Sequence, residues 1–223
     1  MNEYIEFFKL LKSARKEDKI MNSIIIDGCV AAGKTSLMNI IEEEFRYTPF
    51  LEPVTDNPLL DKFYYNRKRY SFPLQIFFLN KRFAMLKEAA KIDGTVMDRS
   101  IYGDVIFAKL LADNQEMESE EYALYKDLLA NMLEHVEPPK LMIYLKSSTD
   151  DIIRKIKLRG RDYEQVVERE YWEQLNKEYE DYFSEYNISP LLVVEVDNLD
   201  YVHNERDREY IISLIKNKLK EIG

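Results

Sequence analysis

A glycine-rich loop followed by a lysine and a threonine is the strongest chemical signal in the sequence. Residues 28–35 read Gly-Cys-Val-Ala-Ala-Gly-Lys-Thr, which fits the G-x-x-x-x-G-K-[ST] pattern of a phosphate-binding loop, or P-loop. The glycines let the backbone N–H groups converge on an anion, and the helix behind the loop adds a positive dipole end. We expect Lys34 to reach the β- and γ-phosphates of a nucleotide and Thr35 to offer its hydroxyl to Mg²⁺. The nucleotide-binding residues predicted here are Gly28, Cys29, Val30, Ala31, Ala32, Gly33, Lys34, Thr35 and Ser36.

Polar side chains at the ends of short apolar runs are a second signal. Glu52 and the pair Asp98-Arg99 occupy such positions, where carboxylates and a permanently charged guanidinium suit metal, hydroxyl or phosphate ligands. Gln75 carries both a donor and an acceptor, so it can form two hydrogen bonds with the edge of a nucleobase. Gln75 and Arg82 are seven residues apart, which places them on one face of a predicted helix, ~10.5 Å apart along its axis.

Three cations gather at the end of another predicted helix. Lys155 and Arg159 are one turn apart, and Arg161 follows them in the chain. A helix C-terminus favours cations through its dipole alone, which is one explanation of the cluster. The other is a short basic lid, at about residues 155–165, that closes over a triphosphate and excludes water.

The chain must hold these groups on strands and helices that alternate. Such alternation predicts a parallel sheet covered by helices on both faces, with ligands outside the carboxyl ends of the strands. Gly28, Glu52 and Asp98 stand at those ends. The predicted strands are residues 23–27, 48–52, 95–98, 141–145 and 191–196, and the predicted helices are residues 34–45, 58–66, 72–91, 101–112, 118–135, 148–159, 168–186 and 207–222.

Composition narrows the class of protein. The 223 residues suffice for one α/β domain, and a net charge of −9 argues against nucleic acid as the main partner. The single cysteine, Cys29, excludes an intramolecular disulfide and fits a reducing cytoplasm. No run approaches the ~18 apolar residues that a membrane span needs.

The first twenty residues carry no motif. Residues 1–20 predict an N-terminal amphipathic helix packed on the domain, and residues 21–223 a single catalytic domain. Removing the segment before Met21 is therefore expected to leave the catalytic constants of a folded protein unchanged.

Several short strings, taken in order, resemble one family of P-loop enzymes. The Asn-Lys-x-Asp guanine reader of a GTPase is missing. The strings Glu52-Pro53-Val54, Phe72-Pro73-Leu74-Gln75, Asp98-Arg99-Ser100 and Arg159-Gly160-Arg161, with Glu164 behind them, resemble the deoxynucleoside kinases, in particular the bacterial deoxyadenosine and deoxyguanosine kinases. The resemblance runs from about residue 24 to about residue 201. It implies the P-loop kinase fold, a five-stranded parallel sheet with a short basic lid. It also implies a cytoplasmic homodimer that uses ATP and Mg²⁺ to phosphorylate the 5′-hydroxyl of a deoxynucleoside in nucleotide salvage.

The same resemblance assigns roles at the phosphate end of the site. Glu52 matches the base that takes the proton of the 5′-hydroxyl, and Arg99 matches the arginine at that hydroxyl and at the transferring phosphoryl group. With Lys34 they form the expected catalytic set. Asp98, with Thr35, is expected to hold Mg²⁺.

At the acceptor end, the resemblance assigns the nucleobase to Gln75, Arg82, Asp104 and Phe107, although plain core packing is an alternative for Phe107. Further assignments go to the 3′-hydroxyl, at Tyr64 (or Tyr65, if the register is off by one) with Glu164. The lid cations Lys155, Arg159 and Arg161 go to the phosphates, and Asp200 and Tyr201 to a loop beside the adenine of ATP.

Asp104 bears on the choice of nucleobase, because a carboxylate can only accept hydrogen bonds and so favours an exocyclic amino group. We expect deoxyadenosine to be the best acceptor, deoxyguanosine and deoxycytidine to follow, and thymidine to be worst by at least ~10-fold. Two alternatives stay open. A nucleoside monophosphate kinase would need extra arginines for the phosphate of its acceptor, and a non-catalytic P-loop subunit would bind nucleotide only to regulate a partner.

Overall fold

A five-stranded parallel sheet forms the centre of the protein. The structure is a computed structural model that describes residues 2–14, 20–51, 57–165 and 167–223. The strands lie in the order β2-β3-β1-β4-β5, so the chain starts at the middle of the sheet and moves first to one edge and then to the other. Their bounds are β1 Met21–Gly28, β2 Thr48–Phe50, β3 Thr95–Asp98, β4 Pro139–Lys146 and β5 Leu191–Glu195.

The central strand explains why the sheet is covered on both faces. In β1, Ile24, Ile25 and Ile26 all have no exposed surface, although successive side chains point to opposite faces. Ile24 and Ile26 belong to one apolar cluster and Ile25 to another. A run of apolar residues without alternation is typical of a parallel strand buried on both sides.

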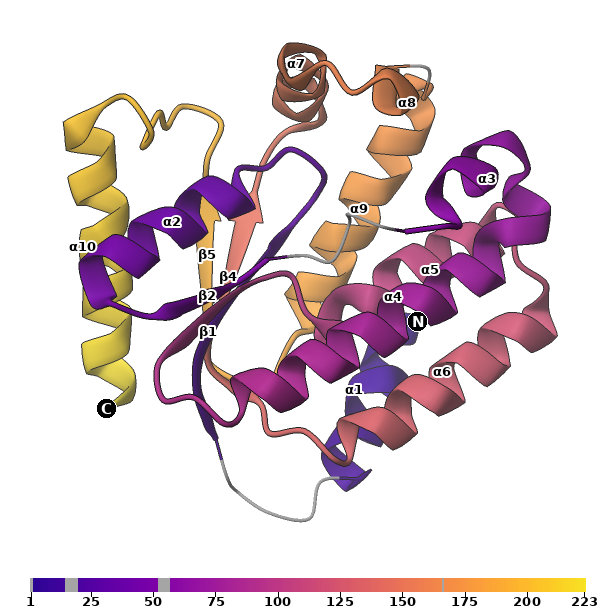
Figure 1. The fold of residues 1–223 in the computed structure, drawn as a ribbon, viewed down its shortest axis with the longest axis horizontal. Coiled ribbons are helices and arrows are strands. Elements are labelled where there is room, and N and C mark those ends of the chain that lie inside the picture. Colours follow the sequence, from indigo (N-terminus) through magenta and orange to yellow (C-terminus); the bar gives the residue numbers. More distant parts are fainter. Residues whose placement is uncertain (1, 15–19, 52–56, 166) are drawn as a thin grey trace.

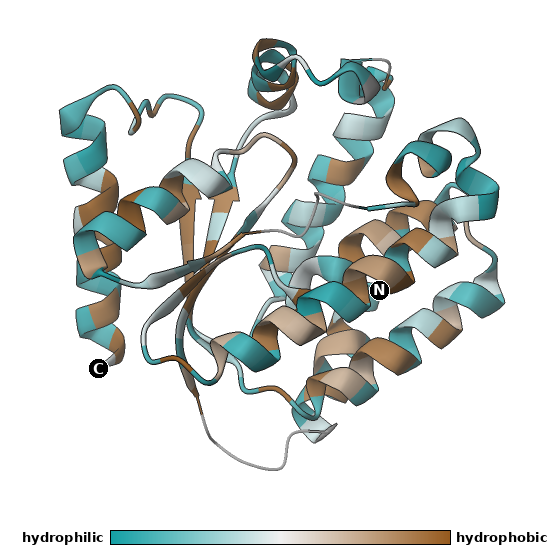
Figure 2. Ribbon diagram, viewed as in Figure 1, coloured by the Kyte–Doolittle hydropathy of each residue, from teal (hydrophilic) through white to brown (hydrophobic). Residues whose placement is uncertain are grey.

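Helices form a layer on each face of the sheet (Figure 1). The cluster around Ile24 and Ile26 includes side chains of α2 and α10, and the cluster around Ile25 includes side chains of α1, α4, α5, α6 and α9. Figure 2 shows hydrophobic colour along the strands and hydrophilic colour on much of the outer helix surface. The bounds are α1 Glu3–Ala14, α2 Lys34–Phe45, α4 Arg67–Ala89, α5 Asp104–Asp113, α6 Ser119–Leu133, α9 Arg169–Glu185 and α10 Glu205–Ile222.

Shorter elements lie toward the carboxyl ends of the strands (Figure 1). One of them is a 3-10 turn, η1, which lies between β3 and α5 in the chain. The remaining bounds are α3 Leu60–Tyr65, η1 Ile101–Gly103, α7 Thr149–Arg159 and α8 Asp162–Gln165. The predicted basic lid coincides with the end of α7 and with α8, which the sequence did not indicate as a helix.

One helix begins earlier than the sequence predicts. We expected a start at Phe72, but α4 begins at Arg67, because the side chain of Asn66 caps it by accepting the N–H of Arg69 at 3.2 Å. Pro73 therefore lies inside the helix, where its missing N–H removes one backbone hydrogen bond. Of the predicted strand at residues 48–52, the structure has Thr48–Phe50 as a strand and Leu51 outside it, while Glu52 lies outside the described residues.

The N-terminal helix contributes to the main core. Its side chains Tyr4, Phe7, Phe8 and Leu11 are all buried, and the ring of Phe8 lies 5.0 Å from that of Tyr182 in α9. The expected amphipathic helix is therefore present as α1, and its apolar face is continuous with the rest of the core. Among the described residues, no helix is both long enough and apolar enough to cross a membrane.

Candidate active site

The P-loop joins β1 to α2, and its backbone has the special conformations that the glycines predict. Gly33 has φ 101°, and a Cβ at this position would overlap the hydroxyl of Tyr201. Ala31 also has a positive φ of 61°, which is uncommon for a residue with a side chain. The loop therefore combines left-handed backbone with close packing.

The lysine and the threonine of the loop both have defined hydrogen-bond partners. Lys34 is 7% exposed, and its Nζ donates to the carbonyl oxygens of Gly28 at 2.9 Å and Cys29 at 2.7 Å. The hydroxyl of Thr35 donates to Oδ2 of Asp98. The other carboxylate oxygen of Asp98, Oδ1, is buried and has no hydrogen-bond partner in the described part of the chain. A hydroxyl and a carboxylate with a spare oxygen fit Mg²⁺, which usually takes one or two protein oxygens together with substrate phosphates and water.

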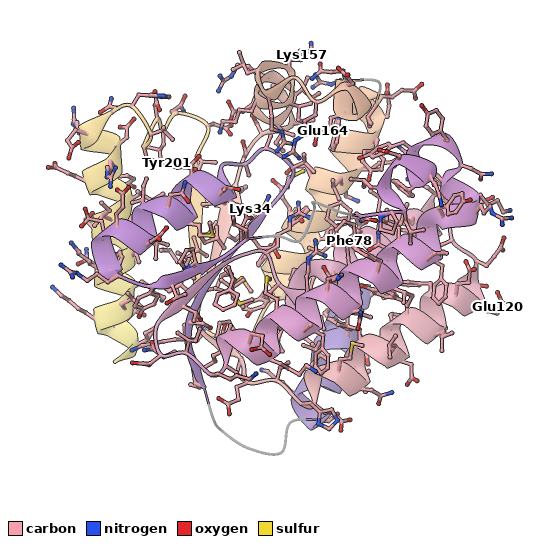
Figure 3. All side chains as sticks on the ribbon, in the orientation of Figure 1. Lys34, Phe78, Glu120, Lys157, Glu164 and Tyr201 are labelled. Carbon is pink, nitrogen blue, oxygen red and sulfur yellow. The ribbon has the colours of Figure 1, made fainter. Side chains whose placement is uncertain are left out.

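One cleft of about 620 Å³ opens above the P-loop. It is bounded by the P-loop and by side chains of α3, α4, α5, α7, α8 and α9. Figure 3 labels Lys34 at the start of α2, Phe78 on α4 and Glu164 on α8, which mark three sides of it. The predicted site residues that line the cleft are Val30, Ala31, Gly33, Lys34, Thr35, Ser36, Tyr64, Gln75, Arg82, Asp98, Arg99, Phe107, Lys155, Arg159, Arg161 and Glu164.

A buried ion pair lies at the end of the cleft formed by α4 and α5. Arg82 and Asp104 are each 3% exposed, and Nη1 of Arg82 donates to Oδ1 of Asp104. The guanidinium carbon of Arg82 lies 4.7 Å from the ring centre of Phe78. Gln75, one turn before Phe78, is 5% exposed and lines the same end. Gln75 and Arg82 thus share a face of α4 that lines the cleft, and their roles toward a nucleobase stay a prediction.

Arg99, which also lines the cleft, contacts both the P-loop and α5. Its backbone has φ 65°, and its N–H donates to the carbonyl of Ile26 at 2.9 Å. The guanidinium carbon lies 4.8 Å from the ring centre of Phe107 and 5.9 Å from that of Tyr179. Phe107 is half-buried and lines the cleft, so its ring packs against a cation as well as against the core.

The two candidate tyrosines in α3 differ clearly. Tyr65 is 92% exposed, whereas Tyr64 lines the cleft. Glu164, 5% exposed, forms ion pairs with Arg159 at 2.6 Å and with Arg161 at 3.5 Å. The acid that the sequence assigns to a sugar hydroxyl therefore also holds the two lid arginines.

Lys155 has an acidic partner of its own. Its Nζ lies 2.6 Å from Oδ2 of Asp151, which is 7% exposed. Burial alone would raise the pKa of Asp151, but hydrogen bonds from Lys155 and Arg154 hold that pKa below its ordinary value. Asp151 is thus an ionised anchor for a lid cation.

Several predicted residues do not line the cleft. Tyr201 is 4% exposed and donates its hydroxyl to the carbonyl of Gly33 at 3.1 Å, so it supports the loop from outside. Asp200 accepts the N–H of His203 at 3.1 Å. Burial raises the pKa of Cys29 to about 11, which fits its interpretation as a small filler. Glu52 lies outside the described residues. The others away from the lining are Gly28, Ala32 and Asp104, whose carboxylate is reached through Arg82.

The sequence did not single out the apolar wall of the cleft. Phe78 lies three residues after Gln75 and four before Arg82, so helix periodicity could have found it. Tyr171, from a distant helix, has no comparable local signal. The lining residues that were missed are Leu51, Leu60, Phe63, Leu74, Phe78, Leu111 and Tyr171.

Comparisons with known proteins show the family to which the sequence and the fold are similar. The family model described as deoxynucleoside kinase matches residues 24–220. A deoxyguanosine kinase of Lactobacillus acidophilus is 39% identical over 212 residues, which cover 91% of this chain and 93% of that protein. A deoxyadenosine/deoxycytidine kinase of Bacillus subtilis is 36% identical, covering 90% of this chain and 94% of that protein. The structure of a deoxyadenosine kinase from M. mycoides, with the products dCMP and dCDP bound, superposes with a TM-score of 0.79 at 33% identity and covers 87% of this chain and 99% of that one.

Proposed function

The chain belongs to the deoxynucleoside kinase family, and we propose that it transfers the γ-phosphate of ATP to the 5′-hydroxyl of a deoxynucleoside. The proposed acceptor is a purine deoxynucleoside, with deoxyadenosine preferred, or deoxycytidine. As a deoxynucleoside kinase it is a phosphotransferase of nucleotide salvage. One observation carries the finer proposal: a single cleft joins the P-loop lysine, Lys34, to the end lined by Gln75 and Arg82. A phosphate donor and a nucleoside acceptor can therefore meet in it.

The phosphate end supplies positive charge and fixed geometry, which are what phosphoryl transfer mainly requires. Lys34 and Arg99 are both nearly buried, so their charges act on the phosphates with little screening by water. Thr35 and Asp98 are the residues that would hold Mg²⁺. When bound, the ion would neutralise charge on the β- and γ-phosphate oxygens.

Glu52 is the proposed base, because a hydroxyl becomes an adequate nucleophile only as its proton is removed. Although Glu52 lies outside the described residues, Leu51 directly before it lines the cleft.

The acceptor end favours a nucleobase with an exocyclic amino group. Gln75 offers a donor and an acceptor, and the buried Arg82–Asp104 pair presents fixed charges beside it. Phe78 and Phe107 provide apolar faces for a planar base. The named relatives are kinases of deoxyguanosine, deoxyadenosine and deoxycytidine, whose bases all carry an exocyclic amino group.

The lid would close through an exchange of partners. Arg159 and Arg161 pair with Glu164, and phosphate oxygens would compete with that carboxylate for the two guanidinium groups. Glu164 would then be available to the 3′-hydroxyl of the sugar, together with Tyr64. Closure of this kind excludes water and so limits hydrolysis of ATP.

We further propose a cytoplasmic homodimer. Half-buried apolar side chains on α4 and α6, such as Phe72, Ile76 and Leu128, support an interface built from these helices. Light scattering of the purified protein would give its mass, and a monomer at working concentrations would contradict the proposal.

The proposed reaction is tested by ADP release with a panel of deoxynucleosides, with the product identified as a 5′-monophosphate by mass spectrometry. Turnover should require ATP, Mg²⁺ and an acceptor, and Lys34→Ala should nearly abolish it. ADP release that ignores the acceptor, or appreciable turnover in excess EDTA, would refute it.

A further inference from the structure

Asp27 is a buried acid for which the proposed mechanism has no use. It lies in β1 directly before the P-loop, is 1% exposed and does not line the cleft. Its Oδ1 accepts the N–H of Gly28 at 2.8 Å. A carboxylate so fully removed from water costs free energy of folding unless strong partners compensate it. A role beyond packing would explain why an acid occupies this place.

Gly28, whose N–H binds Asp27, also binds the two proposed catalytic cations, Lys34 and Arg99. The carbonyl of Gly28 accepts from Nζ of Lys34 at 2.9 Å and from Nη2 of Arg99 at 3.4 Å. In the parallel register Ile26 stands opposite Asp98, so Asp27 and Arg99 are the next residues along two neighbouring strands. Gly28 therefore links Asp27 to the two cations: its N–H binds the carboxylate of Asp27, and its carbonyl oxygen binds the head groups of Lys34 and Arg99.

The space around Asp27 leaves its carboxylate little freedom. A Cβ on Gly103, at the start of α5, would overlap Oδ2 of Asp27, so the carboxylate lies against the backbone there. In the part of the chain that the structure describes, the ionisable groups that interact electrostatically with Asp27 include Lys34, Arg82, Arg99, Cys29, Tyr144 and Tyr182.

Charge and solvation act on Asp27 in opposite directions. Burial raises its pKa, while Arg99 and Lys34 pull that pKa down, and burial has the larger effect. A raised pKa means that ionisation of Asp27 lowers the stability of the folded protein at pH values above the ordinary carboxyl pKa. The negative charge is thus costly to the fold and favourable to the two cations.

We propose that Asp27 is a positioning residue for phosphoryl transfer: its carboxylate anchors Gly28 and counterbalances Lys34 and Arg99, so that both head groups stay aimed at the transferring phosphoryl. The inference rests on the proposed function, in which these two cations act on the phosphates. Asp27 touches neither substrate and acts only through Gly28, Lys34 and Arg99.

Asp27→Asn tests the proposal, because asparagine keeps the shape and an acceptor oxygen for the N–H of Gly28 but carries no charge. A displacement of about 1 Å in a catalytic group can cost about 100-fold in rate, so we expect kcat to fall by ~10–100-fold. The melting temperature should stay the same or rise. The KM and Kd for ATP should not increase, because the phosphates meet a more positive site.

Glu178→Gln is the matched control. Glu178 is another largely buried acid, 13% exposed in its side chain, but it lies in α9, where Tyr4 and Lys109 bind it. Here the melting temperature should fall while kcat stays within ~2-fold, since the change removes a structural ion pair. The two variants should thus show opposite patterns.

The outcomes separate the two proposals. A parent protein that turns over no deoxynucleoside contradicts the proposed function itself. In that case the ATP affinity and the melting temperature of Asp27→Asn still test the role of Asp27. A lower melting temperature for Asp27→Asn, loss of folding, weaker ATP binding, or an unchanged kcat would each overturn the positioning role. A reduced kcat with undiminished stability and ATP affinity supports it.

Discussion

Breaking the Arg82–Asp104 pair one residue at a time should be far more damaging than replacing both residues together. Each side chain is only 3% exposed. Asp104→Ala would remove the carboxylate that pairs with the Arg82 guanidinium, and Arg82→Met would remove the guanidinium that pairs with the Asp104 carboxylate. Removing one partner of a buried ion pair costs about 3–5 kcal/mol.

The double replacement has a different balance. Methionine at position 82 fills apolar space beside Phe78, and no charge is left in the interior at this point. Replacing a whole buried pair by apolar residues of similar volume is often neutral or stabilising by about 1–4 kcal/mol. Alanine at position 104 is smaller than aspartate, and the space that it leaves should make the double variant slightly less stable than the parent. For a protein of this size, about 1 kcal/mol corresponds to about 2–4 °C, so each single variant should melt ~6–20 °C lower and the double variant only a few degrees lower.

The same set of variants tests substrate choice. In the parent, thymidine should have a kcat/KM at least ~10-fold below that of deoxyadenosine, because Arg82 would have to leave its pairing with Asp104 to reach the O4 carbonyl of thymine. The double variant should narrow or reverse this gap. Melting curves and initial rates with four deoxynucleosides measure both effects.

A control pair distinguishes a local effect from general loosening. Lys109 and Glu178 are 3.2 Å apart and 15% and 13% exposed, outside the cleft lining. Replacing both should change stability but not the ranking of acceptors. Additive single and double effects on stability would refute the reasoning about the buried pair, and so would a ranking that the double variant leaves untouched, or a parent that prefers thymidine.

Three other predictions follow. Glu52→Gln keeps the shape of the proposed base but cannot accept its proton, so kcat should fall by ~10²–10⁴-fold with ATP affinity nearly unchanged; turnover within a few-fold of the parent would contradict the assignment. Phe8→Ala removes a side chain of α1 that is 1% exposed, which should cost about 3–5 kcal/mol in thermal or denaturant unfolding with kcat unaltered, and a loss of only a few tenths would show that α1 is a loose appendage. Because the pKa of Asp151 is lowered in the folded protein, its contribution to stability is fully present above its ordinary carboxyl pKa and is lost as pH falls through the folded value. Asp151→Asn should therefore lower the melting temperature at pH 7 more than at pH 3, and an equal loss at both would contradict the ion-pair role.

The burial of α1 alters an interpretation that was based on motifs alone. No motif precedes Ser23, which led us to expect that the first twenty residues could be removed without kinetic effect. In the structure, Tyr4 and Phe8 lie in the main core. Removing them would take apolar side chains out of that core, so a truncated protein is harder to fold than the sequence implied.

Local features were predictable from the sequence because neighbouring residues make them. The P-loop consists of consecutive residues, Gly28 to Thr35, between the apolar strand β1 and the start of α2. Its groups therefore come together without help from distant parts of the chain. The parallel sheet was also predictable from local sequence, because a continuous apolar run such as Ile24–Ile26 indicates a strand that helices cover on both faces.

Tertiary structure alone decided which side chains face one another. Tyr64 and Tyr65 are adjacent in the sequence, and only the packing of α3 against α4 separates one that lines the cleft from one that is 92% exposed. Tyr171 reaches the cleft, and Tyr201 the P-loop, from elements far along the chain. The burial of Asp27 beneath Lys34 and Arg99 depends on how β1, β3 and α5 meet, because desolvation and charge are properties of the assembled interior and not of any local string of residues.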